Sequence, residues 1–225
     1  MNEKSRPVSA AELQTGITVL SVRRHLGINI LSLSDGSELS LPHALFLRCP
    51  WRTGALISPE AFHAWVAANE YSSALERAGH SLSARNRTEH ELEEALIRAG
   101  YSEGCTQKVI DRLRGVGYLD DRGYAESYVR QRATLGYGAG RIRQELRLKG
   151  IREEHIQAAL DALSEDTQEE TIRKAAEKAA RGKDLSSFKD RQRVKAALAR
   201  KGFDFDSIDA VLSEMAAEPE ESFDE

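Results

Sequence analysis

Two adjacent aspartates are the first residues of this chain whose types could carry out chemistry. Asp120 and Asp121 follow Gly117-Tyr118-Leu119, and paired carboxylates can bind a metal ion or act in acid-base catalysis. They also stand between a helix that ends at a glycine and a new helix. An aspartate in that place accepts hydrogen bonds from free backbone amides and favours the positive end of the helix dipole. We therefore interpret both residues as structural.

The histidines and cysteines form no pattern typical of a metal site. No two of the six histidines lie four residues apart, and Cys49 and Cys105 have no second thiol nearby. The sequence thus predicts no metal and no cofactor, and no pairing of a nucleophile with a base indicates an enzyme. Isolated cysteines fit a reducing cytosol, and no apolar run is long enough for a membrane span. We expect a cytoplasmic protein without a membrane partner.

A glycine-rich segment, Gly136-Tyr137-Gly138-Ala139-Gly140-Arg141, precedes a predicted helix. It lacks the lysine and the preceding strand of a phosphate-binding loop. Backbone amides at a helix N-terminus, followed by Arg141 and Arg143, could still bind a phosphate or a carboxylate. A flexible turn before a solvated helix is the alternative that we favour.

Basic residues are concentrated in two stretches of a chain whose formal net charge is -4. Residues 122–152 contain eight basic side chains and two acidic ones, and residues 189–201 contain six basic side chains and one aspartate. Two such faces indicate a shared electrostatic surface for DNA phosphates or for an acidic protein groove. The candidate binding residues are Arg130, Arg132, Arg141, Arg143, Arg147, Lys149, Lys195 and Arg200. Apart from Tyr137, we expect no aromatic side chain interleaved with them as a platform for stacking single-strand bases.

The strand signals all lie in the first seventy residues. Residues 18–22 and 28–33 have strand composition, and a turn at Ser34-Asp35-Gly36-Ser37 leads into residues 38–41. Ser58 and Pro59 predict the start of a helix that closes this unit. We expect a small β-hairpin or meander plus a helix over residues 15–69, after a disordered N-terminus at residues 1–14.

From about residue 71 the chain repeats itself, in three copies that contain Gly100, Gly150 and Gly202. Each copy has a leucine four residues before its glycine and a large apolar residue directly after it. This spacing predicts two helices joined at a glycine in the left-handed conformation. A further helix is predicted before each pair, at residues 71–83, 121–133 and 167–180.

The predicted fold is mainly α, with tandem three-helix repeats in an elongated array and a small N-terminal β-hairpin and helix extension. The repeats occupy residues 70–119, 120–165 and 166–217. An acidic disordered tail is expected at residues 218–225. Aromatic residues make up only 6% of the chain, which favours helices that share small cores.

Several segments of the repeats resemble the RecX family of bacterial recombination regulators, which modulate the RecA recombinase. They are Arg87-Thr88-Glu89-His90-Glu91-Leu92, Leu113 with Gly117-Tyr118-Leu119-Asp120-Asp121, Tyr124-Ala125 with Tyr128, and Arg141-Ile142 through Lys149-Gly150-Ile151. The resemblance is dense over residues 71–164 and thinner through residue 217. The third repeat departs from it by an insertion at residues 181–187.

The resemblance implies a tandem three-helix-repeat fold, no enzymatic activity, and a role in recombination and DNA repair. It also implies binding in the groove of the RecA filament on DNA, with inhibition of the RecA ATPase and of strand exchange. The expected partners are therefore the RecA filament and single- and double-stranded DNA, and we expect a monomer. The alternative is a free-standing DNA-binding module without a protein target.

Overall fold

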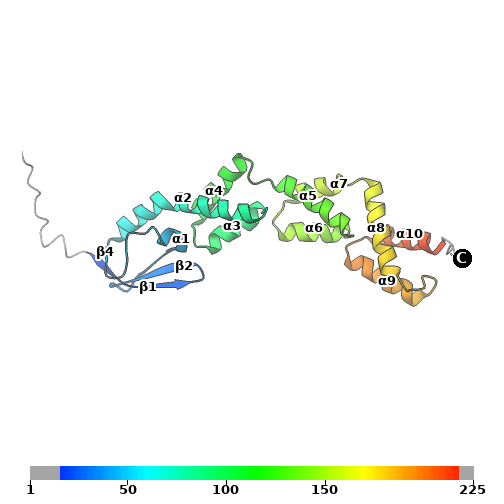
Figure 1. The fold of residues 1–225 in the computed structure, drawn as a ribbon, viewed down its shortest axis with the longest axis horizontal. Coiled ribbons are helices and arrows are strands. Elements are labelled where there is room, and N and C mark those ends of the chain that lie inside the picture. The colour runs from blue at the N-terminus through cyan, green and yellow to red at the C-terminus, as the bar shows by residue number, and fades with distance from the viewer. Residues whose placement is uncertain (1–15, 218–225) are drawn as a thin grey trace, which may run out of the picture. The chain divides into compact units, whose positions relative to one another are not determined.

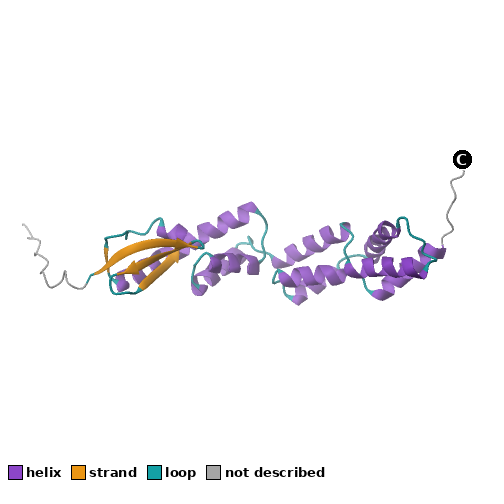
Figure 2. Cartoon of the chain, turned by 90° about the horizontal axis from the view of Figure 1, so that it is seen from below, coloured by secondary structure: helices purple, strands orange, loops and turns teal. Residues whose placement is uncertain are grey.

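The structure, a computed structural model, describes residues 16–217 (Figure 1). The segments expected to be disordered, residues 1–14 and 218–225, lie outside the described residues. The chain divides into two compact units between Leu119 and Asp120. Figure 2 shows that the strands all belong to the N-terminal part and that the remainder is helical.

The sheet has four antiparallel strands in the order β3-β2-β1-β4. They are β1 (Ile17–His25), β2 (Ile28–Leu33), β3 (Glu38–Pro42) and β4 (Leu56–Ile57). The first three strands match the predicted ones, and Gly36 has a φ of +85° in the turn between β2 and β3. The fourth strand was not predicted, because two residues are too few to show an alternation of polar and apolar side chains.

Two helices cover the sheet, and they are α1 (His43–Phe46) and α2 (Pro59–Ala84). Ser58 caps α2 as predicted, since its side chain accepts a hydrogen bond from the Ala61 amide and Pro59 is the first helical residue. Phe62 of α2 belongs to the core beneath the sheet, together with Leu31, Leu33 and others.

Helix α2 continues without a break where the sequence suggested two helices, at residues 61–68 and 71–83. No glycine or proline separates these segments, so nothing in the local sequence ends the first helix. The C-terminal half of α2 buries Ala74 and Ala78 in the core of the first repeat. The predicted boundary between residues 69 and 70 thus falls inside one helix that the sheet and the first repeat share.

The remaining helices form the repeats in groups of three. The first repeat adds α3 (Glu89–Arg98) and α4 (Glu103–Gly115) to α2, and the second has α5 (Asp121–Thr134), α6 (Ala139–Leu148) and α7 (Glu153–Asp161). The third has α8 (Glu165–Ala180), α9 (Phe188–Arg200) and α10 (Phe205–Ala217). Each repeat has its own buried core. The mainly helical fold with a small N-terminal sheet is confirmed, whereas the elongated form of the array stays a prediction.

Glycines with positive φ angles and a side-chain cap mark several of the predicted helix ends in the structure. Gly100, Gly150 and Gly202 have φ angles of +93°, +76° and +89°, which a residue with a side chain rarely adopts. Asp120 caps α5, because its Oδ1 accepts a hydrogen bond of 2.9 Å from the Gly123 amide. Among the described helices, none is both long and apolar enough to cross a membrane.

A candidate nucleic-acid interface on the second repeat

Helices α5 and α6 present one face each to a common surface. Tyr124, Tyr128 and Arg132 recur every four residues on α5, and Arg141, Glu145 and Lys149 do so on α6. The contacts pair the start of one helix with the end of the other, so the helices run in opposite directions. We call this the tyrosine-cation surface. Its members are Tyr124, Tyr128, Arg132, Tyr137, Arg141, Glu145, Lys149 and Lys201.

Four cations lie against the three tyrosine rings. Lys149 Nζ is 5.5 Å from the ring centroid of Tyr124 and 5.7 Å from that of Tyr128. The Arg132 guanidinium carbon is 5.2 Å from the Tyr128 centroid and 4.9 Å from the Tyr137 centroid. The Tyr137 ring also has the Arg141 guanidinium at 4.5 Å and Lys201 Nζ at 6.0 Å. These separations are those of cation-π contacts.

The tyrosines of α5 are themselves stacked, with ring centroids 6.0 Å apart and planes inclined by 15°. All three tyrosines are half-buried, so each residue keeps some solvent-accessible surface. The expectation that Tyr137 alone would interleave with basic side chains is therefore wrong. Tyr124 and Tyr128 were not among the binding candidates, but the four-residue spacing that they share with Arg132 could have placed them on the basic face.

Glu145 lies at the centre of the surface and holds the cations in place. It accepts hydrogen bonds from Tyr128 Oη (2.9 Å), Arg132 Nε (2.7 Å) and Arg141 Nε (3.0 Å). Burial raises the pKa of Glu145, but these three donors outweigh it and hold the pKa below its ordinary value. Burial, and then the bond to Glu145, raises the pKa of Tyr128. Four cations and one carboxylate leave the surface with a net positive charge.

The glycine-rich segment before α6 contacts the third repeat. The Gly138 and Gly140 amides donate hydrogen bonds of 2.9 Å to the carbonyl oxygens of Lys201 and Gly202, at the end of α9. The Gly138 and Gly140 amides are therefore not free to bind an anion, because the third repeat already accepts their hydrogen bonds. The contact carries Lys201 to the Tyr137 ring, where burial and then the nearby Lys178 lower the pKa of Lys201.

The eight basic residues singled out in the sequence do not gather in one place. Arg132, Arg141 and Lys149 belong to the tyrosine-cation surface. Arg143 and Arg147 lie four residues apart on α6 and both pair with Glu153 at the start of α7. Arg147 Nε is 2.8 Å from Oε2 and Arg143 Nε is 3.5 Å from Oε1.

The other three candidates lie outside this surface. Lys195 forms an ion pair of 2.6 Å with Asp209 and lies 5.5 Å from the Phe205 centroid. Arg130 and Arg200 are exposed, and the former contacts the Ser127 hydroxyl at 3.4 Å. Lys201 was not among the candidates, since only the contact between repeats brings it to the tyrosines.

A bound metal has no evident place in the described part of the chain. Residues 16–217 contain no group of three or more histidine, cysteine, aspartate or glutamate side chains arranged to hold a metal ion. The surface therefore offers positive charge and aromatic rings, and these suit the phosphates and bases of a nucleic acid.

Models of three protein domains match the repeats in order. The model described as RecX, first three-helix domain, matches residues 74–113, and those of the second and third three-helix domains match residues 120–160 and 166–212. Together they cover more than half of the chain. The chain belongs to the RecX family.

Curated RecX relatives, each named Regulatory protein RecX, extend this match. The Geobacillus sp. (strain WCH70) protein is 34% identical over 184 residues, which cover 81% of this chain and 68% of that protein. The Mycobacterium leprae (strain Br4923) protein is 36% identical over 62% of this chain and 84% of its own length. The Bacillus licheniformis protein is 40% identical, and this RecX chain spans about half of its length (51%).

Two solved RecX structures have the same fold. A crystal structure of regulatory protein RecX superposes with a TM-score of 0.61 at 27% identity, over 88% of this chain and 98% of that one. A crystal structure of RecX from Lactobacillus salivarius has a TM-score of 0.62 at 29% identity, over 67% and 99%. The family is thus one of regulatory proteins.

Proposed function

We propose that this RecX-family chain is a non-enzymatic regulator that binds the RecA filament on DNA and inhibits RecA ATP hydrolysis and strand exchange. Family membership supports the regulatory role. The tyrosine-cation surface supports contact with the DNA of the filament, and it is the observation on which the proposal mainly rests. We also propose that the protein acts as a monomer in the cytoplasm.

The chemistry of this surface matches single-stranded DNA within a filament. Lys149 and Lys201 can neutralise phosphates, which provides affinity without sequence preference. The tyrosine rings can stack on unpaired bases, and base-aromatic stacking is also tolerant of sequence. A regulator that must act wherever a filament forms needs this kind of recognition.

The second candidate function is DNA binding without a protein target. One observation favours it: the tyrosine-cation surface is built entirely from the second and third repeats, so this chain alone supplies all of its cations and rings. Among the eight predicted residues, Arg130 and Arg200 remain candidates for contacts to either DNA or protein, because both are exposed.

The decisive experiment measures ATP hydrolysis by RecA on single-stranded DNA as this protein is added. The surface variant Lys149→Gln with Lys201→Gln removes two charges from the proposed interface. The control Lys108→Gln with Arg112→Gln removes two charges from exposed positions of α4. The parent and the control should inhibit at the same concentration, and the surface variant should require about tenfold more protein, as expected for two lost charge contacts of about 0.7 kcal/mol each.

The outcomes separate the two functions. If the parent binds DNA but leaves ATP hydrolysis unchanged at saturating concentration, the free-standing DNA-binding module is the correct function. If the surface variant inhibits as well as the parent, the tyrosine-cation surface does not contact the filament.

A further inference from the structure

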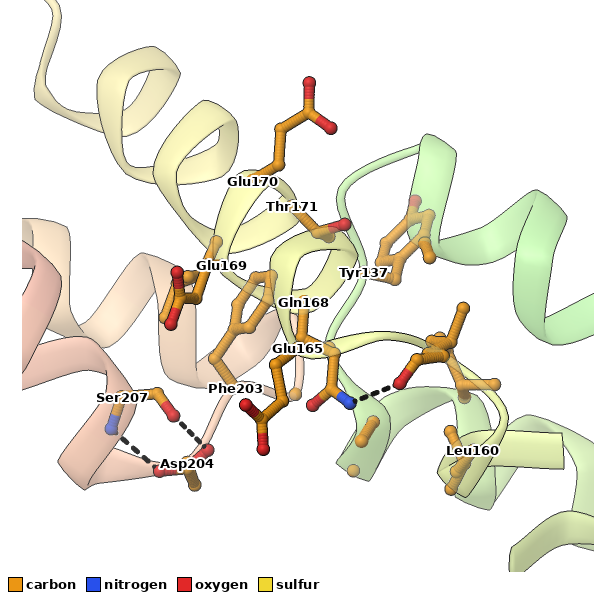
Figure 3. Close-up of a pocket in the computed structure, with 18 of the residues that line it drawn as sticks. Tyr137, Leu160, Glu165, Gln168, Glu169, Glu170, Thr171, Phe203, Asp204 and Ser207 are labelled. Carbon is orange, nitrogen blue, oxygen red and sulfur yellow. Dashed lines mark hydrogen bonds between the residues drawn. The ribbon is translucent and has the colours of Figure 1, made fainter. Parts of the chain in front are cut away.

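A groove of about 1090 Å³ lies between the second and third repeats, and its charge is opposite to that of the tyrosine-cation surface (Figure 3). Its walls come from the α5–α6 connection and the start of α6, the end of α7, the first turns of α8, the turn after Gly202, and α10. Tyr137 lines the groove and also belongs to the tyrosine-cation surface, so the two sites are neighbours. The volume of the groove lies at the upper end of the roughly 300–1,000 Å³ of typical small-molecule sites, and the groove is open on one side. It therefore suits a segment of polypeptide better than a metabolite.

Carboxylates dominate the walls. Seven line the groove, against the two guanidinium groups of Arg143 and Arg173; they are Asp161, Glu165, Asp166, Glu169, Glu170, Asp204 and Glu214. Both guanidinium groups are already engaged, since Arg143 is near Glu153 and Arg173 Nη2 is 2.9 Å from Glu214 Oε2.

Five of these carboxylates form no ion pair with a described residue. Asp161 and Asp204 accept hydrogen bonds instead, and the side chains of the other three do not. Glu165, Asp166 and Glu169 are exposed, and none forms an ion pair with a residue in the described part of the chain. The dipole of α8 stabilises negative charge at its first turn, which accounts for the tolerance of Glu165 and Asp166 there. The helix dipole does not cancel the negative electrostatic potential of these carboxylates in the groove.

The floor of the groove is apolar. Phe203 and Leu163 are half-buried, and the nearly buried side chains of Leu160 and Ile172 extend the floor. Figure 3 shows the Phe203 ring between the α8 side chains and the turn that bears Asp204. An apolar floor within an acidic rim distinguishes this groove from an ordinary solvated helix end.

We propose that this groove binds a basic segment of a protein partner, in which an apolar side chain is flanked by lysines or arginines. The apolar side chain would pack on Phe203 and Leu163, while its basic neighbours would pair with Glu165, Asp166 and Glu169. Charge complementarity selects this partner class, because the same carboxylates repel nucleic acid. The proposal is independent of RecA inhibition, since a peptide can occupy the groove whether or not the tyrosine-cation surface contacts a filament.

The test uses the full chain and fluorescein-labelled peptides of twelve residues, followed by fluorescence anisotropy. The probe alternates lysine and leucine, and two companions replace either the leucines by serine or the lysines by glutamate. The groove variant combines Glu165→Gln, Asp166→Asn and Glu169→Gln. The control combines Glu93→Gln, Glu177→Gln and Asp206→Asn, which removes the same charge from exposed positions outside the groove.

We expect the groove variant to bind the lysine-leucine peptide about tenfold more weakly than the parent, as three exposed ion pairs would predict. The control should stay within about twofold. The serine and glutamate companions should each bind the parent at least about tenfold more weakly than the probe. Circular dichroism checks that each variant is folded. If the triple variant is unfolded, the single variant Glu169→Gln, in the second turn of α8, replaces it and should weaken binding about twofold.

Each opposite result overturns the proposal. If the parent and the groove variant bind the peptide equally well, the three carboxylates do not contribute to binding. If the groove variant and the control lose the same affinity, the peptide is attracted only by the overall negative charge of the protein. A serine companion that binds as tightly as the probe excludes the apolar floor.

Discussion

At the scale of single residues, Glu145 determines how the cations of the second repeat are arranged. Its carboxylate accepts hydrogen bonds from two guanidinium groups and one phenol, and its side chain is 18% exposed. A carboxylate in this position fixes Arg132 and Arg141 against the tyrosine rings. The Glu145 carboxylate lowers the net positive charge of the surface by one, and in return the two guanidinium groups are held in a defined geometry.

The depressed pKa of Glu145 predicts a dependence of stability on pH. A carboxyl group whose pKa is lower in the folded state contributes stability above its unfolded value of about 4.5, and that contribution is lost as the pH falls through the folded value. Glu145→Gln should lower the free energy of unfolding by about 1–2 kcal/mol at pH 7. The difference between parent and variant should then shrink below about pH 4.5.

Urea denaturation at a series of pH values measures this difference. Glu177→Gln is the control, because this exposed carboxylate of α8 forms no ion pair with a described residue. If the free energies of unfolding of the parent and of Glu145→Gln differ by the same amount at pH 7 and at pH 3, the pKa of Glu145 is not lowered by folding.

The two cysteines lead to a second prediction at this scale. Burial raises the pKa of the Cys105 thiol to about 11, and burial also raises the pKa of Cys49. Since the thiolate is the reactive form, neither residue should react with a thiol reagent at pH 8 in the folded protein. Both should react at once in denaturant, and absorbance of the released thiolate measures the number modified. Rapid modification of either thiol in the native state would show that this thiol is accessible to solvent rather than buried.

At the scale of elements, Gly202 joins the third repeat to the second. It ends α9 with a φ of +89°, and an added Cβ would overlap the backbone nitrogen and the Cβ of Arg141. Gly202→Ala should therefore lower the free energy of unfolding by about 2–5 kcal/mol, through backbone strain and overpacking together. Gly117 has a similar φ of +79° and open space around it, so Gly117→Ala should cost only about 1–2 kcal/mol. Equal losses in urea denaturation would show that the repeats do not contact each other at Gly202.

Helix α6 allows a matched test of the repeat core. Leu146 is fully buried, whereas Leu148 on the same helix is 77% exposed. Leu146→Ala should destabilise the protein by about 2–5 kcal/mol because it leaves a cavity, and Leu148→Ala should change stability by less than about 0.5 kcal/mol. Thermal or urea unfolding compares the two, and a neutral Leu146→Ala would place this residue outside the core.

At the scale of the whole molecule, opposite charges are separated onto different surfaces of a chain whose net charge is only -4. The tyrosine-cation surface is basic and the groove beside α8 is acidic. We expect this separation to let one protein attract nucleic acid and a basic protein segment at once, although its total charge would favour neither.

The separation predicts how DNA binding depends on salt. Each phosphate contact should add about 0.7 to the slope of log affinity against log salt for single strands. Lys149→Gln with Lys201→Gln should therefore make the slope shallower by about 1.4, as measured by titration of labelled DNA at several salt concentrations. The control on α4 should keep the parent slope. Binding to the RecA filament should fall less steeply than binding to DNA alone, because a protein interface with an apolar core depends less on counterion release.

The sequence by itself determined the features that depend on near neighbours in the chain. Apolar spacing and the three glycines located the repeats, and Ser58 and Asp120 marked the starts of two helices. These signals are local because a helix, its cap and its glycine end involve residues within about four positions of each other. The resemblance to RecX rested on the same local segments, which is why the family could be identified before the fold was known.

Only the tertiary structure decided which side chains meet. The pairing of Arg143 and Arg147 with Glu153 and the contact of Gly138 with Lys201 both depend on how elements pack. Gly138 and Lys201 are far apart in the chain, and no periodicity within a helix records such a contact. The same packing brings Lys201 to Tyr137 and forms the acidic groove between the repeats, so the groove and the contribution of Lys201 are products of repeat docking.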